Sequence, residues 1–126
     1  MKLLLFLLLA NLTINCSSKV KLSSSDDLVF SNGKEKIELK ILTGENYLED
    51  NKVNDIKVIL KNINPKTMSF SGYGIKYSKD KTKYKNQVLL EIEPNKTVMK
   101  SDTLKIIVSY KKEQNITYHE FKIPVK

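Results

Sequence analysis

The stretch LKIIVSY, residues 104–110, alternates large apolar side chains with other residues over most of its length. Successive side chains of a β-strand point to opposite faces, so every second residue shares a face. One face of this stretch would be wholly apolar, and it would carry Leu104, Ile106, Val108 and Tyr110. Ile107 would lie on the opposite, solvated face. The stretch therefore predicts a β-strand that buries one side and exposes the other.

The same period of two recurs on both sides of this stretch. The residues expected to face inward with it are Ile37, Leu39, Ile41, Ile56, Val58, Leu60, Val88, Leu90, Ile92, Phe121, Ile123 and Val125. Turn residues separate these strands at 31–33 (Ser-Asn-Gly), 64–65 (Asn-Pro), 94–95 (Pro-Asn) and 113–115 (Glu-Gln-Asn). Short strands are also expected at 68–70 and 74–77, with Gly72 marking a bulge or kink between them.

These short alternating strands predict an all-β fold, an antiparallel β-sandwich of about seven strands that spans residues 28–126. The architecture resembles the immunoglobulin-like sandwich. Antibody domains of that kind carry a buried Trp and a disulfide between the sheets, whereas this chain has no Trp and one Cys. We therefore expect the core to be held together by apolar burial without a disulfide.

Residues 1–15 have the pattern of a secretory signal peptide. Lys2 precedes an apolar run at residues 3–10, which is shorter than the roughly 20 residues that a membrane-spanning helix needs. The single cysteine, Cys16, follows a few residues later and has no second cysteine with which to pair. A lone cysteine in this position suggests a site of lipid attachment.

This N-terminal region resembles the type II signal peptide of bacterial lipoproteins. In that family the cysteine thiol receives a diacylglyceryl group, the peptide is cleaved just before it, and the new amine is acylated. The resemblance implies that Cys16 carries lipid chains, which together form a stable membrane anchor. The usual lipobox has an aliphatic and a small residue where this chain has Thr13 and Asn15, and Leu12 lies one place too early. The alternative is an ordinary signal peptide cleaved elsewhere, with Cys16 in a frayed tail.

Residues 16–27 are expected to comprise the lipidated cysteine and a flexible polar tether, because they contain few large apolar side chains. Ser17 follows the cysteine, and the family's best-known sorting rule retains lipoproteins in the inner membrane when Asp is there. The resemblance thus implies a lipid-anchored cell-envelope protein at the outer membrane. Whether it faces the periplasm or the cell surface stays open.

The chain is basic, with a formal net charge of +8. All 22 basic residues are lysine, against 14 acids. A surface that reads nucleic acid normally uses Arg for bidentate contacts to bases and phosphates, and an exported protein does not meet nucleic acid. We therefore expect no nucleic-acid partner and attribute part of the lysine content to the codon usage of an AT-rich genome.

The most distinctive polar segment is residues 73–85, in which tyrosines and lysines are interleaved. The predicted binding residues are Tyr73, Tyr77, Lys79, Lys81, Lys83 and Tyr84. Tyrosine offers rigid contact area and lysine attracts anions, so this segment could bind an acidic envelope protein, a glycan or a lipid headgroup. The alternative is a solvated hairpin tip without a binding role.

Residues suited to enzyme or metal chemistry are sparse. His119 is the only histidine, and we expect it to be a half-buried residue near a strand end. The acids Glu45, Glu49, Asp50 and Asp55 could bind calcium through oxygen ligands, although their spacing is not that of an EF-hand and a solvated loop is the alternative. We predict no catalytic residues, no metal site and no cofactor.

The sequence therefore predicts a lipid-anchored envelope lipoprotein that acts as a non-enzymatic binding module. An alternative is a structural accessory lipoprotein subunit of an envelope secretion or motility complex, docked by a sheet edge. A small hydrolase is a third hypothesis, and it would have to depend on His119.

Overall fold

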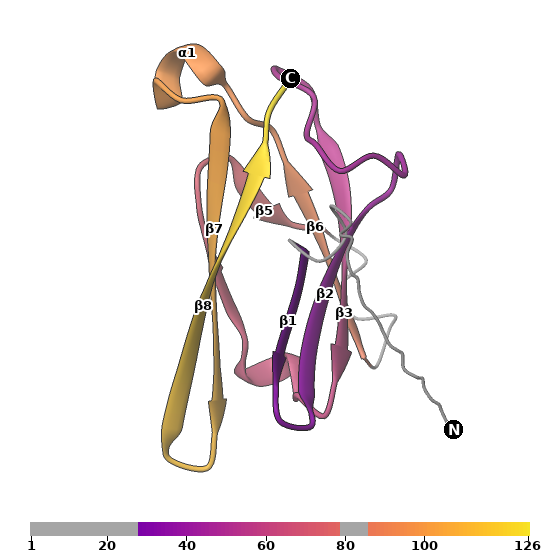
Figure 1. The fold of residues 1–126 in the computed structure, drawn as a ribbon, viewed down its shortest axis with the longest axis vertical. Helices are drawn as coiled ribbons and strands as arrows, with labels where there is room; N and C mark the ends of the chain where they lie inside the picture. Colours follow the sequence, from indigo (N-terminus) through magenta and orange to yellow (C-terminus); the bar gives the residue numbers. More distant parts are fainter. Residues whose placement is uncertain (1–27, 79–85) are drawn as a thin grey trace, which may run out of the picture.

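Two antiparallel β-sheets pack face to face in the computed structural model, which describes residues 28–78 and 86–126 (Figure 1). Its strands are β1 (Val29–Asn32), β2 (Glu35–Ile41), β3 (Asn54–Lys61), β4 (Ser69–Ser71), β5 (Ile75–Tyr77), β6 (Gln87–Ile92), β7 (Thr103–Lys112) and β8 (Asn115–Pro124). Two short helical turns connect strands, η3 (Pro65–Thr67) and α1 (Lys96–Met99). None of the described helices is long and apolar enough to cross a membrane. The predicted all-β sandwich is confirmed.

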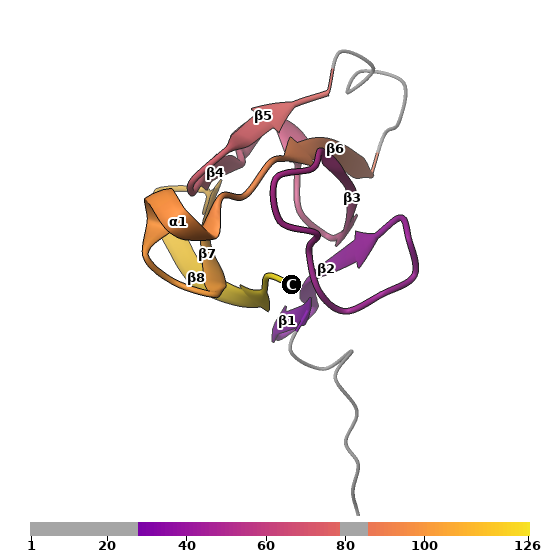
Figure 2. The same ribbon diagram turned by 90° about the horizontal axis from the view of Figure 1, so that it is seen from above.

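The strand order is that of an immunoglobulin-like sandwich. One sheet has the order β1-β2-β3-β6-β5 and the other has the order β4-β7-β8. If β1 is set aside, these orders correspond to the ABED and CFG sheets of a constant-type immunoglobulin domain. Figure 2 looks along the long axis and shows the strands arranged around the core. The described residues thus form eight strands rather than about seven, and β1 is the additional one.

β1 pairs with β2 through a tight turn at residues 33–34, next to the turn predicted at 31–33, because Ser31 and Asn32 belong to β1. Gly33 adopts a positive φ of 65°, a conformation that glycine reaches without steric cost. The turn sets Asn32 opposite Glu35, so that β1 adds to the edge of β2. The turn predicted at residues 113–115 is shorter than expected, because β7 ends at Lys112 and β8 already begins at Asn115.

The two inner faces form one buried apolar cluster. Every residue that the alternation predicted to face inward is buried, from Ile37 in β2 to Val125 after β8. Ile106 and Val108 at the centre of β7 have no exposed surface, whereas Ile107 between them is 44% exposed. Because a strand alternates its faces, the opposite exposures of Ile106 and Ile107 confirm a half-solvated sheet.

A long loop between β2 and β3 closes one end of the sandwich, which the alternation did not predict. Leu48 in this loop is fully buried and pairs with Val125 in a parallel bridge. Its backbone N–H donates to the Pro124 carbonyl at 2.8 Å, and its own carbonyl accepts from the Lys126 N–H at 2.9 Å. Asn54, the buried first residue of β3, stabilises the loop, because its side-chain Oδ1 accepts a hydrogen bond from the Glu49 N–H at 2.9 Å.

The predicted bulge at Gly72 is instead the point where the chain crosses between the sheets. β4 belongs to the three-stranded sheet, and β5 belongs to the five-stranded sheet. A Cβ atom on Gly72 would lie 2.7 Å from the Lys105 carbonyl oxygen, so no larger residue fits without backbone movement. Gly74 has a positive φ of 72° and packs directly on the backbone of Glu93. Close backbone approach explains both glycines.

Truncating the two neighbouring isoleucines of β7 should have unequal effects. Ile106→Ala should lower the free energy of unfolding by about 2–5 kcal/mol, because it removes buried surface and leaves a cavity. Ile107→Ala should cost less than about 1 kcal/mol, because nearly half of the side chain already contacts water. Urea unfolding of both variants measures the difference, and equal losses would contradict the exposure of the outer face.

Candidate functional site

The segment predicted to bind a partner is described only in part. Tyr73 and Tyr77 are 42% and 44% exposed, which leaves both available for contact. Lys79, Lys81, Lys83 and Tyr84 lie outside the described residues, as does Cys16. The backbone carbonyl of Asn86, the first described residue after this segment, accepts a hydrogen bond from the Leu60 N–H at 2.9 Å. The chain therefore re-enters the sheet beside the last residues of β3.

Tyr77 has a structural contact as well as an exposed surface. It pairs with Leu90 of β6, so its side chain points to the inner side of the five-stranded sheet. Its ring meets Phe70 of β4 edge-on, with 6.0 Å between the ring centroids. Because β4 belongs to the other sheet, this pair bridges the seam where β5 and β4 lie next to each other. Tyr77 thus stabilises the fold in addition to any binding role.

His119 lies at the opposite seam, between β1 and β8. Its ring stacks on Phe30 of β1 with 4.3 Å between centroids and meets Phe121 edge-on at 4.5 Å. The expected half-burial is confirmed, but the expected position near a strand end is wrong, because His119 lies in the middle of β8. Burial lowers the pKa of His119 below its ordinary value of 6.5, and nearby Glu120 raises it by a smaller amount. The neutral ring therefore serves as an aromatic packing group.

A buried polar link joins the two sheets at the end opposite Leu48. Glu35 begins β2 with its side chain turned inward, and the residue is only 7% exposed. The Tyr110 hydroxyl donates to Glu35 Oε1 at 2.6 Å, and Lys112 Nζ lies 3.2 Å from Glu35 Oε2. The hydrogen bond from Tyr110 lowers the pKa of Glu35, helped by Lys112 and opposed by burial. Burial and the bond to Glu35 raise the pKa of Tyr110.

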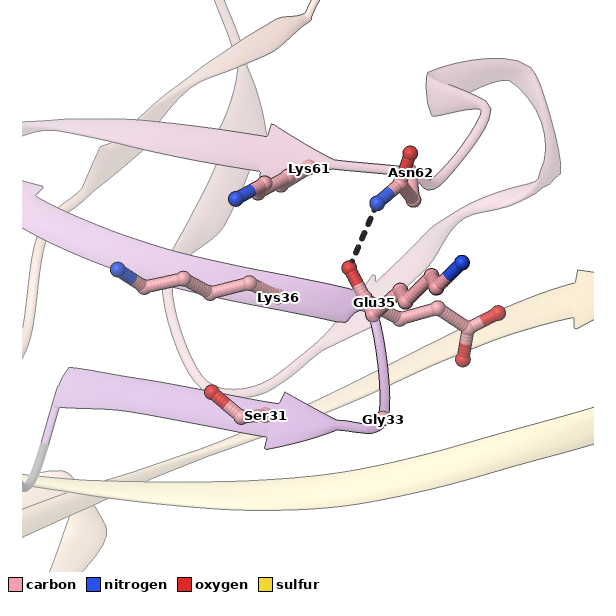
Figure 3. Close-up of a pocket in the computed structure, with 7 residues that line it drawn as sticks. Ser31, Gly33, Glu35, Lys36, Lys61 and Asn62 are labelled. Atoms are coloured by element: carbon pink, nitrogen blue, oxygen red, sulfur yellow. Dashed lines mark hydrogen bonds between the residues drawn. The ribbon is translucent and has the colours of Figure 1, made fainter.

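Directly beside this link, on the outer side of the sheet, is an open depression of about 470 Å³. It is lined by Ser31, Gly33, Lys34, Glu35, Lys36, Lys61 and Asn62. Lys36 of β2 and Lys61 of β3 lie directly opposite each other in the sheet register. Figure 3 shows their side chains projecting in the same direction from neighbouring strands, while the Glu35 carboxylate points away from both. We call this feature the lysine depression.

The rim of the lysine depression is fixed by backbone geometry. Asn62 adopts a left-handed φ of 58° at the end of β3, and its Nδ2 donates to the Lys34 carbonyl at 2.8 Å (Figure 3). This bond ties the end of β3 to the β1–β2 turn. Within residues 28–78 and 86–126, Lys34, Lys36 and Lys61 form no ion pair. The depression therefore presents three lysines that form no ion pair there, on a fixed frame.

The acids considered for calcium do not gather around one point. Asp50 Oδ1 accepts the Lys96 N–H at 2.9 Å, and Glu49 lies 3.3 Å from Lys52 Nζ. No group of three or more His, Cys, Asp or Glu side chains that could hold a metal occurs in the described part of the chain. Asp50 instead fastens the β2–β3 loop to the start of α1.

No protein-family model, no curated protein and no solved structure matches this chain. Its class is consequently defined by the strand order alone, as an immunoglobulin-like β-sandwich.

Sequence reasoning missed the lysine depression. The sequence places Lys34, Lys36 and Lys61 in strands or turns, but their proximity depends on the register between β2 and β3. The sequence could have shown that both lysines lie on the outer face of the sheet, because Lys36 and Lys61 alternate with the inward-facing residues of their strands.

Removing the charge of Glu35 should change the pH dependence of stability. The folded-state pKa of Glu35 lies below its ordinary value of 4.5, so its ionised form stabilises the fold above that pH. This contribution is lost as pH falls from about 4.5 through the lowered pKa. Glu35→Gln should therefore be less stable than wild type at neutral pH, with the difference shrinking in acid. Urea unfolding across this pH range tests it, with Glu38→Gln on the outer face as the control. A difference that stays constant with pH would contradict the link.

Proposed function

We propose that this protein is a lipid-anchored, non-enzymatic binding module of the bacterial cell envelope, held at the outer membrane through Cys16. The anchor is supported by the N-terminal pattern and by the lone cysteine that follows it. The described residues add a folded domain whose buried cluster lies entirely between Leu28 and Val125.

The observation that carries the binding role is the uneven distribution of charge along the sandwich. The end formed by the β1–β2 turn, η3 and the β7–β8 turn (the lower end in Figure 1) carries Lys34, Lys36, Lys61, Lys66, Lys111 and Lys112. The opposite end mixes both signs, with Glu45, Glu49, Asp50, Glu93 and Asp102 beside Lys52, Lys96 and Lys100. The lower end also carries Glu35, which is paired with Lys112, and Glu113 in the β7–β8 turn, so its six lysines leave an excess of positive charge. An excess of one sign steers partners of the other sign toward it. The basic end therefore suits an anionic partner.

The proposed absence of catalysis is supported by the environment of His119. Its ring packs against Phe30 and Phe121, and burial favours its neutral form. A general base must reach the proton that it removes, and this ring is occupied with packing between two strands. The packing of His119, the one histidine of the chain, therefore gives no support to the small-hydrolase hypothesis.

The alternative role, a structural accessory subunit of an envelope secretion or motility complex, is supported by β8. This strand ends the three-stranded sheet and pairs only with β7 in the described residues. Its outer face exposes Ile116 at 54% and Tyr118 at 67%, next to Ile107 of β7 at 44%. A long edge strand with apolar side chains is the kind of surface to which a partner adds a strand.

Replacing the cysteine tests the anchor. Cys16→Ala should abolish incorporation of labelled fatty acid and leave the protein uncleaved or soluble, because the thiol is the attachment point. Ser17→Ala is the control and should incorporate the label as wild type does. Persistent labelling of the Cys16→Ala protein would refute the anchor while leaving the binding role open.

Capture from envelope extracts separates the two roles. Changing Lys79, Lys81 and Lys83 to Glu should slow partner association by about tenfold or more if charge steers binding. Changing Lys40, Lys52 and Lys100 to Glu alters the net charge equally and should have a smaller effect. Loss of the partner on Tyr118→Ser alone would favour the accessory role. An unchanged partner profile for the first lysine variant, at equal melting temperature, would return residues 73–85 to a solvated tip.

A further inference from the structure

We propose that the lysine depression is a phosphate-binding site. This proposal deepens the proposed binding function by naming the ligand class, and it does not depend on the lipid anchor. The phosphate could be free or part of a lipid headgroup, since both present the same tetrahedral group of oxygens. The site would lie at the basic end of the sandwich, between the β1–β2 turn and the end of β3.

The first argument is the uncompensated pair at the centre of the depression. Lys36 and Lys61 are direct cross-strand neighbours, and such neighbours have Cβ atoms about 4.5–5.5 Å apart. Like charges in this relation destabilise a sheet. The nearest carboxylate in the lining, that of Glu35, is turned inward and engaged by Tyr110 and Lys112. An anion bound between the two ammonium groups would remove their repulsion.

The second argument compares the surroundings of Lys36 and Lys61 with those of other lysines on the outer faces of the sheets. Lys105 and Lys122 are also directly opposed, on the outer face of the three-stranded sheet, but they do not line the depression. Lys40 and Lys57 are a third directly opposed pair. Lys40 lines a second depression of about 280 Å³, whose lining includes two acids, Glu38 and Glu45. The lysine depression adds a third ammonium from Lys34, the hydroxyl of Ser31 and the amide of Asn62.

The third argument concerns the shape of the ligand. Lysine acts as a compact point charge, whereas arginine forms a planar fork that matches a carboxylate. Donors on three lysines, a serine and an asparagine come from three strands and the β1–β2 turn, and they suit an anion with oxygens in several directions. One amide hydrogen of Asn62 is used by the Lys34 carbonyl, and its second is available to a ligand. Tetrahedral phosphate meets these conditions better than a planar carboxylate.

The backbone around the lysine depression is held in place before any ligand binds. The Asn62 bond to Lys34 fixes the rim, and the Glu35 link to Tyr110 and Lys112 fixes the underside. The lysine stems are flexible, but their Cα positions are set by the sheet register. Binding therefore orders side chains without rearranging the backbone, which limits its entropic cost.

Titration with inorganic phosphate tests the site. Residues 17–126 include every member of the buried cluster found among the described residues, and they lack Cys16, so this protein can be studied without lipid. Phosphate, added at constant pH and ionic strength, should shift the amide resonances of Gly33, Lys34 and Asn62 in a saturable way. Lys36→Gln combined with Lys61→Gln should weaken this binding by about tenfold or more, because two charge-assisted contacts are lost. Lys105→Gln combined with Lys122→Gln removes the same net charge and should bind as wild type.

A second arm identifies the source of the phosphate. The same three proteins are mixed with vesicles of phosphatidylcholine, with and without phosphatidylglycerol. Loss of vesicle binding restricted to the Lys36 and Lys61 variant assigns a lipid headgroup, and selective loss of inorganic phosphate alone assigns a free phosphate. Equal losses in both variants, equal binding of acetate, or no saturable binding in either arm would overturn the proposal. Melting of each variant confirms that the fold is intact.

Discussion

Burial of one apolar cluster between two sheets is the interaction on which the rest of this structure depends. The chain has a single cysteine, so no disulfide within it can link the sheets, and the faces of β3 and β7 must hold through packing. Ile56, Val58, Ile106 and Val108 have no exposed surface, which places them at the centre of that contact.

A packed core of this kind must also be closed at its seams and ends. Aromatic pairs close the two seams, Phe30 with His119 on one side and Phe70 with Tyr77 on the other. Leu48 fills one end, and the link between Glu35 and Tyr110 closes the other. The polar link has a consequence for the surface. Because it turns the Glu35 carboxylate inward to Tyr110 and Lys112, that carboxylate does not pair with the lysines of the depression, and the closure of the core thereby favours a basic depression.

The candidate sites differ in how far the sequence could predict them. The interleaved tyrosines and lysines of residues 73–85 are contiguous, so composition alone drew attention to them, and Tyr73 and Tyr77 are indeed exposed. The lysine depression instead combines side chains of the β1–β2 hairpin with side chains at the end of β3, which is distant in the sequence. Lys36 and Lys61 become neighbours only through the pairing of β2 with β3. No local pattern reports on pairing partners, because the register is decided by turns and by the whole buried face.

The sequence by itself determined the fold class, the faces of the strands and several turns. Period-two alternation is a local property, and every residue that it placed inside is buried. Tertiary structure alone decided which strands are neighbours, where β1 adds to the sheet, and how the β2–β3 loop brings Leu48 to Val125. It also decided that His119 packs between two phenylalanines in mid-strand, and that Glu35 is buried despite its charge. These features depend on contacts between residues distant in sequence, and their energies are set by the partners that the fold supplies.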